Sequence, residues 1–218
     1  MVILKTIFQL LYPYGIFRAG EPSADNRTRC TIHRTRTVYL TFDDGPIPEV
    51  TPKVLEILDR YQVKATFFMV GENIDKHPEV FRQVLEAGHS VANHTYNHMK
   101  GWHYSTKEYL ENTAKCQEAI ERNGGTTCLF RPPYGRTWWW QRKAITRMGY
   151  RIYLWDVLTR DYNACQSPEA MMRLIKRRTR PGSLINFHDS IKSNERMLAV
   201  LPQAIEWLQA QGYELRAL

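Results

Sequence analysis

Residues 37–46 read Thr-Val-Tyr-Leu-Thr-Phe-Asp-Asp-Gly-Pro and hold the strongest clue to the fold of this 218-residue chain. The first half is β-branched and aromatic, which is typical of a buried strand. The second half places two carboxylates, Asp43 and Asp44, side by side at a turn. Residues 52–61 then carry apolar side chains at helical spacing. A strand that ends in acidic residues and leads into a helix is the unit from which an α/β fold is built.

The same alternation continues along the rest of the chain. Helix-like segments cover 74–87, 106–123, 140–148 and 168–178, and Pro202 is expected to restart or kink a final helix. Further strand-like segments lie at 65–70, 89–92, 128–130, 151–155, 183–187 and 213–215. Seven strands are fewer than a full eight-unit barrel of about 250 residues needs. We therefore predict an α/β fold, an irregular (β/α)7-type barrel with parallel strands and outer helices, and keep a flat doubly wound sheet as the alternative.

Composition describes an ordinary globular domain. An apolar fraction of 43% and a charged fraction of 24% exclude wholesale disorder. The net charge of +8 is scattered, and its one dense run, 176–180, fits the end of a helix, so nucleic acid is not an expected partner. The cysteines form no C-x-x-C pair, which favours buried thiols over a zinc knuckle: Cys30, Cys116, Cys128 and Cys165.

The N-terminal residues 1–14 are apolar but interrupted by Lys5, Gln9 and Pro13. They fall short of the roughly 20 residues of a membrane span, and they lack a signal peptide's positive start and cleavage site. We expect a short helix packed on the domain or, as second choice, an anchor in peripheral contact with a membrane. A cytoplasmic or membrane-peripheral location follows as the expectation. Residues 1–36 are thus an apolar segment and linker, and 37–218 the main domain.

Unusual polar residues occur where the strand-like segments end. Because the carboxyl ends of parallel strands share one face, we expect these side chains to assemble one site. They are Asp43 and Asp44 after the first strand, His94 and His98 after the third, Arg131 after the fourth, Asp161 beyond the fifth and His188 after the sixth.

The residue types at this face indicate metal chemistry. His94 and His98 are spaced to reach one ion, and Asp44 would complete a set of two nitrogens and one oxygen that leaves positions open for water and substrate. Asp43 could then face the reacting water, with Arg131 as its charge partner. Turn chemistry for the acids and an incidental histidine pair are the plainer interpretations. Residues 138–140, three tryptophans, suit either core packing or stacking on sugar rings.

Together these motifs resemble the polysaccharide deacetylase family, carbohydrate esterase family 4. The similarity covers about residues 37–215 and rests on four motifs: TFDDGP at 41–46, His-Thr-x-x-His at 94–98, RPPY at 131–134, and a strand ending in His188-Asp189. The resemblance implies an irregular barrel as the catalytic domain and a divalent metal, usually zinc. It also implies hydrolysis of N-acetyl groups on amino sugars of a poly- or oligosaccharide, or sometimes of O-acetyl groups on xylan.

The resemblance also implies a role for each matching residue. The metal ligands would be Asp44, His94 and His98. Asp43 would be the base, Arg131 its positioning partner, Tyr134 the backbone donor to the oxyanion, and His188 the general acid with Asp161 beside it.

Two positions depart from the family pattern. Tyr162 stands where the family usually has Trp, and Asn186 where it usually has Leu, and those side chains line the acyl pocket. Asn186 should either bond Tyr162, water or substrate in a pocket suited to formyl or glycolyl groups, or turn away and bond the neighbouring backbone.

Two other classes of function stay open beside the enzyme. One is a catalytically silent carbohydrate-binding module on the same fold, and the other is polyanion binding through the basic surface. The presence of a base, an acid and a full ligand set favours the enzyme, because a silent module needs none of them. The sequence leaves the natural glycan and the oligomeric state open.

Overall fold

The computed structural model describes residues 15–16 and 36–218. The helix expected over 1–14, its membrane contact, Cys30 and the linker up to residue 35 lie outside the described residues. Nine strands of the described chain join in one parallel system in the order β1-β6-β5-β4-β3-β2-β8-β7, with β9 on β2. The bounds are β1 (Gly15–Ile16), β2 (Thr37–Asp43), β3 (Thr66–Met69), β4 (Ser90–Asn93), β5 (Leu129–Phe130), β6 (Arg151–Tyr153), β7 (Val157–Leu158), β8 (Leu184–His188) and β9 (Glu214–Leu215).

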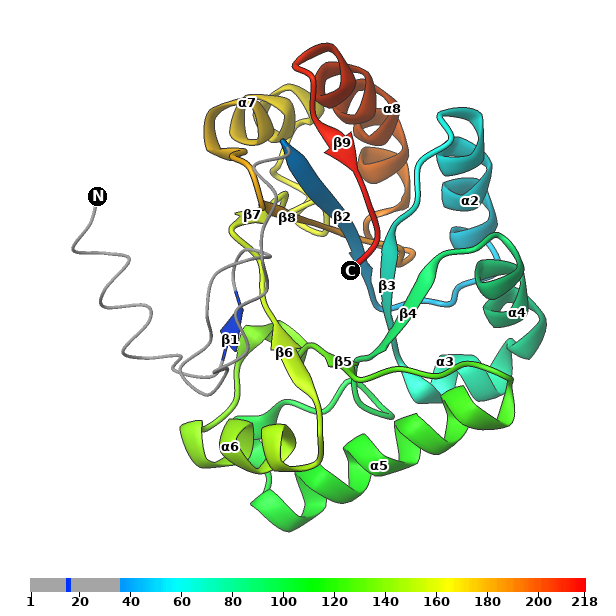
Figure 1. The fold of residues 1–218 in the computed structure, drawn as a ribbon, viewed down its shortest axis with the longest axis vertical. Helices are drawn as coiled ribbons and strands as arrows, with labels where there is room; N and C mark the ends of the chain where they lie inside the picture. Colours follow the sequence, from blue (N-terminus) through cyan, green and yellow to red (C-terminus); the bar gives the residue numbers. More distant parts are fainter. Residues whose placement is uncertain (1–14, 17–35) are drawn as a thin grey trace.

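The sheet curls and the helices cover its outer side (Figure 1). No pairing joins β1 to β7 among the described strands, so hydrogen bonds do not close the barrel there. The predicted irregular parallel barrel is confirmed, and the flat doubly wound sheet is not found. The helices are α2 (Thr51–Arg60), α3 (Gly71–Lys76), α4 (Pro78–Glu86), α5 (Thr106–Arg122), α6 (Trp139–Arg147), α7 (Pro168–Arg178) and α8 (Asn194–Ala210).

Three features of the elements differ from the expectation. The helix expected over 74–87 is divided at His77, because Pro78 disfavours helical geometry in the residue before it. The expected restart at Pro202 is wrong, since α8 runs through it. One lost ladder bond is outweighed there by a face of buried apolar side chains, including Leu201 and Ile205. Strands β1 and β7 were not expected at all.

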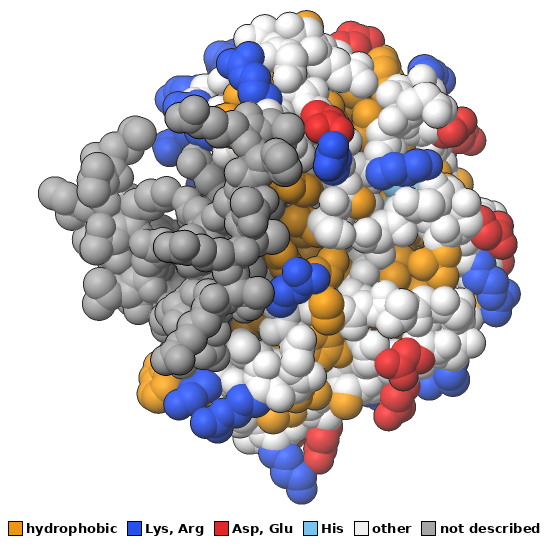
Figure 2. Space-filling model, in the orientation of Figure 1, with side chains coloured by type: hydrophobic (Ala, Val, Ile, Leu, Met, Phe, Trp, Pro, Cys, Tyr) orange, Lys and Arg blue, Asp and Glu red, His pale blue; other side chains and the backbone are white. Residues whose placement is uncertain are grey.

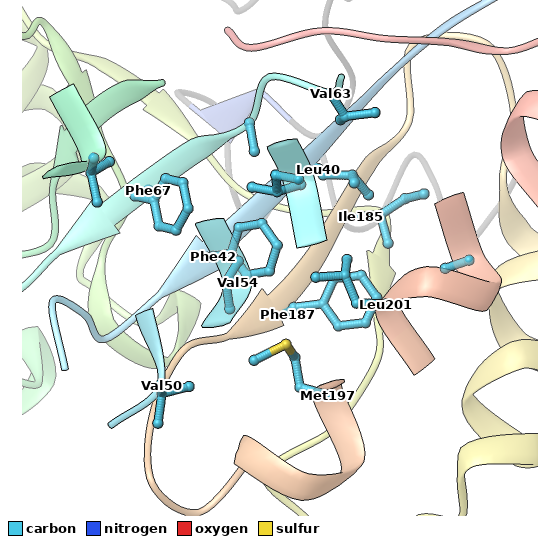
Figure 3. Close-up of a cluster of buried hydrophobic side chains, with 14 of the residues drawn as sticks. Leu40, Phe42, Val50, Val54, Val63, Phe67, Ile185, Phe187, Met197 and Leu201 are labelled. Atoms are coloured by element: carbon cyan, nitrogen blue, oxygen red, sulfur yellow. The ribbon is translucent and has the colours of Figure 1, made fainter. Parts of the chain in front are cut away.

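The main core lies between the outer face of the sheet and the helices α2, α4, α5, α7 and α8. Figure 3 shows the part of it between β2, β3 and β8 and the helices α2 and α8. Phe42 is its centre, with ring centroids 4.9 Å from Phe67 and 5.9 Å from Phe187. Successive side chains of a strand point to opposite faces, so Thr41 and Asp43 of the same strand point into the barrel. Because Phe42 packs on the outer side of the sheet, the carboxylate of Asp43 points to the inner side.

The surface charges and the exposure of the cysteines were both predicted from the sequence. Figure 2 shows Lys and Arg side chains scattered over one face among acidic ones, and residues 176–178 form the exposed last turn of α7 as predicted. Cys116 is buried as predicted, but Cys128 and Cys165 are exposed, so that prediction is wrong for them. In the described part of the chain, no helix is both long and apolar enough to span a bilayer.

Candidate active site

The carboxyl ends of the strands bring the expected polar residues together. Asp43 and His188 are register partners on the neighbouring strands β2 and β8. His94 follows β4 directly and Arg131 follows β5, and a short loop after β7 carries Asp161. The parallel topology therefore assembles one site from residues that are distant in sequence.

Asp44, His94 and His98 form a cluster that could hold a metal ion, with one ligand atom from each lying within 4.8 Å of the others. Asp44 Oδ1 is 3.3 Å from His98 Nε2 and 3.9 Å from His94 Nε2. This oxygen is buried and has no hydrogen-bond partner among the described residues, which is costly for a carboxylate. A divalent cation would supply the missing partner, and two imidazoles with one carboxylate suit zinc. These three residues thus fit the expected metal.

The protonation of His94 also suits a ligand. His94 Nδ1 lies 2.7 Å from the carbonyl oxygen of Arg131, which can only accept, so this nitrogen carries the proton and Nε2 keeps its lone pair. Burial lowers the pKa of His94 to about 3, so the ring is neutral at pH 7. Burial also raises the pKa of the Asp44 carboxyl, against the charges of His188 and His98. Metal binding would therefore be linked to the loss of a proton.

Asp43 is an ionised carboxylate that the protein holds by an ion pair. It is 2% exposed, and Arg131 donates from one guanidinium nitrogen to its Oδ1 at 2.6 Å. Burial alone would raise the pKa of Asp43, but the charge and hydrogen bond of Arg131, together with the charge of His188, outweigh it and lower that pKa. Arg131 is itself fixed by the carbonyls of Tyr153 and Leu154 at 3.1 and 3.0 Å.

His188, in contrast to the deprotonated Asp43, is held in its protonated form. Its Nδ1 lies 2.8 Å from Asp161 Oδ1, and its backbone N–H donates to Asp161 Oδ2 at 2.7 Å. Burial disfavours the imidazolium, but the hydrogen bond and charge of Asp161, with the charges of Asp43 and Asp44, raise the pKa of His188 to about 9. The ring of Tyr162 stands nearly perpendicular to it at 5.0 Å. A charged base and a protonated acid therefore share one rim.

A comparison with known protein families shows which family the chain belongs to. The family model described as polysaccharide deacetylase matches residues 32–153, which is more than half of the chain. The chain belongs to the polysaccharide deacetylase family.

Individual members of the polysaccharide deacetylase family agree with this assignment. A peptidoglycan-N-acetylglucosamine deacetylase of Bacillus cereus is 38% identical over 154 residues, 70% of this chain and 56% of that protein. A chitooligosaccharide deacetylase of Azorhizobium caulinodans is 34% identical over 196 residues, 84% of this chain and 92% of that one. A crystal structure of a peptidoglycan N-acetylglucosamine deacetylase with 4-naphthalen-1-yl-N-oxidanyl-benzamide gives a TM-score of 0.84 at 30% identity, covering 95% of this chain and 91% of that one.

Asn186 is not placed as expected for this polysaccharide deacetylase. It is fully buried, and the bonds that the structure gives its side chain go to other side chains, not to Tyr162 or the neighbouring backbone. Its Oδ1 accepts from Thr41 Oγ1 at 2.9 Å and from Arg131 at 2.6 Å, and its Nδ2 donates to Asp43 Oδ2 at 3.0 Å. Both ends of the amide are occupied by the base and its partners, which removes the basis for an acyl pocket made polar by Asn186.

The loops of the site hold strained backbone. Within the described chain, five of the six non-glycine residues with positive φ lie in these loops: Asp44 (89°), Thr95 (65°), His98 (57°), Tyr134 (59°) and Arg160 (60°). Each such conformation costs on the order of 1–3 kcal/mol and persists only where neighbours hold it. Asn73 Nδ2, for example, donates to the Asp44 carbonyl at 2.8 Å.

Asp189 is a site residue whose part the sequence did not indicate. Its carboxyl group is fully buried and accepts from the Gly45 N–H at 3.0 Å and from Thr51 Oγ1 at 2.7 Å, and its backbone N–H donates to the Asp43 carbonyl at 3.0 Å. A Cβ on Gly45 would lie 2.1 Å from Asp189 Oδ2. Asp189 thus anchors the turn that follows Asp43 and Asp44. Its position directly after His188 was the only available signal.

Proposed function

We propose that the chain is a metal-dependent hydrolase that removes N-acetyl groups from the amino sugars of a poly- or oligosaccharide. The observation that carries the proposal is the pairing of an ionised Asp43 with a protonated His188 beside a cluster of Asp44, His94 and His98. The names of the related proteins, which act on peptidoglycan N-acetylglucosamine and chitooligosaccharides, support the same substrate class.

Asp44, His94 and His98 would hold the metal, with zinc as the ion that best suits these donors. When bound, a divalent ion would polarise the acyl oxygen and make water easier to deprotonate. The neutral His94 and the otherwise unpartnered Asp44 oxygen support this assignment.

Asp43 would take a proton from the attacking water. Its carboxylate is charged, and hydrogen bonds from Arg131 and Asn186 fix both of its oxygens in orientation. The backbone N–H of Tyr134 would donate to the oxyanion that forms on the acyl carbon. The two prolines before Tyr134 and its left-handed conformation hold that N–H in one direction.

His188 would complete the reaction as the general acid. The new C–O bond joins the water oxygen to the acyl carbon, the C–N bond breaks, and the proton on His188 passes to the departing nitrogen. Acetic acid and a free amino sugar result, with one proton of the water on Asp43, and the acetic acid ionises to acetate on release. Asp161 supports this role because it holds the ring and keeps it protonated near neutral pH.

Acetate release from N-acetylglucosamine oligomers and from peptidoglycan tests the proposal. We expect release that a chelator abolishes and added zinc restores. In His188→Ala, amide hydrolysis should fall more than hydrolysis of activated acetyl esters, whose leaving groups need no proton. Glycan binding without acetate release would instead support a silent carbohydrate-binding module, and release from acetylated xylan alone would support an O-acetyl esterase.

A further inference from the structure

Six exposed aromatic side chains gather beside the candidate active site. They come from the loop after His98, from the turn after β5 and from the start of α6, and each is between 41% and 57% exposed: Trp102, Tyr104, Tyr134, Trp138, Trp139 and Trp140. The exposure of residues 138–140 excludes core packing as their role and leaves stacking on sugar rings as the interpretation. Exposed aromatic surface of this size on a monomeric protein marks an interaction site rather than a fold requirement.

The rings form an ordered row, which we call the indole row and define as Trp102, Trp138, Trp139 and Trp140. Trp138 stacks on Trp140 with centroids 5.0 Å apart and planes 8° apart. Trp102 lies 5.8 Å from Trp138, and Trp139 stands edge-on to Trp140 at 5.7 Å. The stacked members support each other, and Trp139 is the most exposed of the four at 53%.

Buried hydrogen bonds fix the two segments that carry the row. Gln141 is fully buried and donates from Nε2 to the carbonyls of Gly101 at 2.9 Å and Tyr104 at 3.2 Å. Its Oε1 accepts from Thr137 Oγ1 at 2.6 Å and from the Trp138 N–H at 2.9 Å. A surface that is already ordered binds without a large entropy cost.

The two chain segments that carry the row also border the candidate active site. The ring of Tyr134 lies 4.7 Å from that of His98, and Lys100 Nζ lies over Tyr134 at 5.6 Å from its centroid. Arg136 lies over Trp102 at 5.2 Å. Aromatic faces, with cationic donors between them, therefore lead away from the candidate metal cluster.

We propose that the indole row binds sugar rings of the substrate beyond the one that loses its acyl group, so that the chain acts on oligomers or polymers of amino sugars in preference to single sugars. The inference rests on the proposed function. The apolar C–H faces of pyranose rings pack on indoles, while Lys100 and Arg136 can donate to hydroxyl and acyl oxygens.

A lipid surface fits the same residues less well. Membrane-inserting patches bring aliphatic side chains together with aromatic ones, whereas the large exposed hydrophobic residues of this patch are all Trp or Tyr. Among the described residues, the large exposed aliphatic ones are Met148, at the far end of α6, and Ile191, in the turn after β8.

The test measures kcat/KM on N-acetylglucosamine oligomers from the disaccharide to the hexasaccharide. For wild type we expect kcat/KM to rise with length. In Trp139→Ala the ratio of hexasaccharide to disaccharide kcat/KM should fall about three- to tenfold, mainly through KM, as expected for loss of one aromatic contact. Trp139→Tyr should restore most of the ratio. Met148→Ala, an exposed residue at the other end of the same helix, is the matched control and should keep the wild-type ratio.

Three outcomes would overturn the inference. The first is an unchanged length ratio in Trp139→Ala, and the second is an equal loss on short and long substrates, which would indicate a distorted site. The third is loss of binding to phosphatidylcholine–phosphatidylglycerol vesicles in Trp139→Ala with no change in the length ratio. If no sugar is deacetylated, the proposed function fails, and hexasaccharide binding followed by tryptophan fluorescence still tests the row, with weaker binding expected in Trp139→Ala.

Discussion

Replacing Asn186 with Leu should destabilise the protein and impair Asp43. The change removes three buried hydrogen bonds, from Thr41, from Arg131 and to Asp43. Thr41 still donates to the Ile185 carbonyl, and Arg131 still donates to Thr41 and Asp43. Within the described part of the chain, Asp43 Oδ2 alone is then left without its side-chain donor. An unpaired buried charged acceptor costs on the order of 1–3 kcal/mol, and the shortened networks add a little more. We expect a loss of about 2–3 kcal/mol in the free energy of unfolding.

The pH dependence of the Asn186→Leu effect follows from the lowered pKa of Asp43. A carboxyl whose pKa is lower in the folded state stabilises the fold above its unfolded pKa of about 3.9, and this contribution is lost as the pH falls through the folded value. A hydrogen bond to the charged form lowers a pKa, so its removal raises the pKa of Asp43. The stability deficit should be full at pH 7 and smaller near pH 4, and the acid limb of kcat/KM should move upward.

Urea unfolding at both pH values and a pH profile of acetate release measure these effects. Thr179→Val is the control, because it removes a buried hydrogen bond to Ile175 at the end of α7, away from the site. It should cost about 1 kcal/mol and leave kcat/KM unchanged. An Asn186→Leu protein with wild-type stability and a wild-type acid limb would refute the reasoning.

Three further predictions concern the proposed roles. Asp43→Asn should keep about one bound divalent ion per chain by elemental analysis while kcat falls by roughly 10²–10⁴, the usual contribution of a general base; near-normal turnover would remove Asp43 from the reaction. His94→Ala or His98→Ala should lose that ion, and full metal content in both variants would contradict the cluster. Asp161→Asn should lower the pKa of His188 from about 9, since the hydrogen bond and charge of Asp161 help to raise it. The form that donates a proton would then be lost at lower pH, and the alkaline limb of kcat should shift downward; an unmoved limb would separate Asp161 from His188.

Local patterns were enough for most of the elements. The alternation that sends Phe42 to the core and Asp43 to the barrel interior is a property of one strand, so it could be recognised without the rest of the molecule. Strand β7, Val157–Leu158, could not, because two residues carry no period. Its existence depends on β8, to which it is hydrogen-bonded.

The candidate site could be predicted only in part, for the same reason. The Arg131–Asp43 pair was expected because two opposite charges at strand ends of one buried site need each other. The partners of Asn186 were not, since a neutral amide can bond many groups. The residues of β8 alone do not show whether the Asn186 side chain lines the acyl pocket or bonds to the base Asp43.

The sequence by itself determined the parallel α/β architecture, the family and the set of polar residues at the strand ends, because periodicity and motif spacing are local. Only the tertiary structure decided which of those polar groups meet. Asn186 reaches Thr41, 145 residues away in sequence, because β2 and β8 pair with Asn186 opposite Thr41. Tertiary structure also decided that the tryptophans of 138–140 are exposed. Strand register and burial arise from contacts between distant segments, and those contacts select one partner among the several that each side chain could accept.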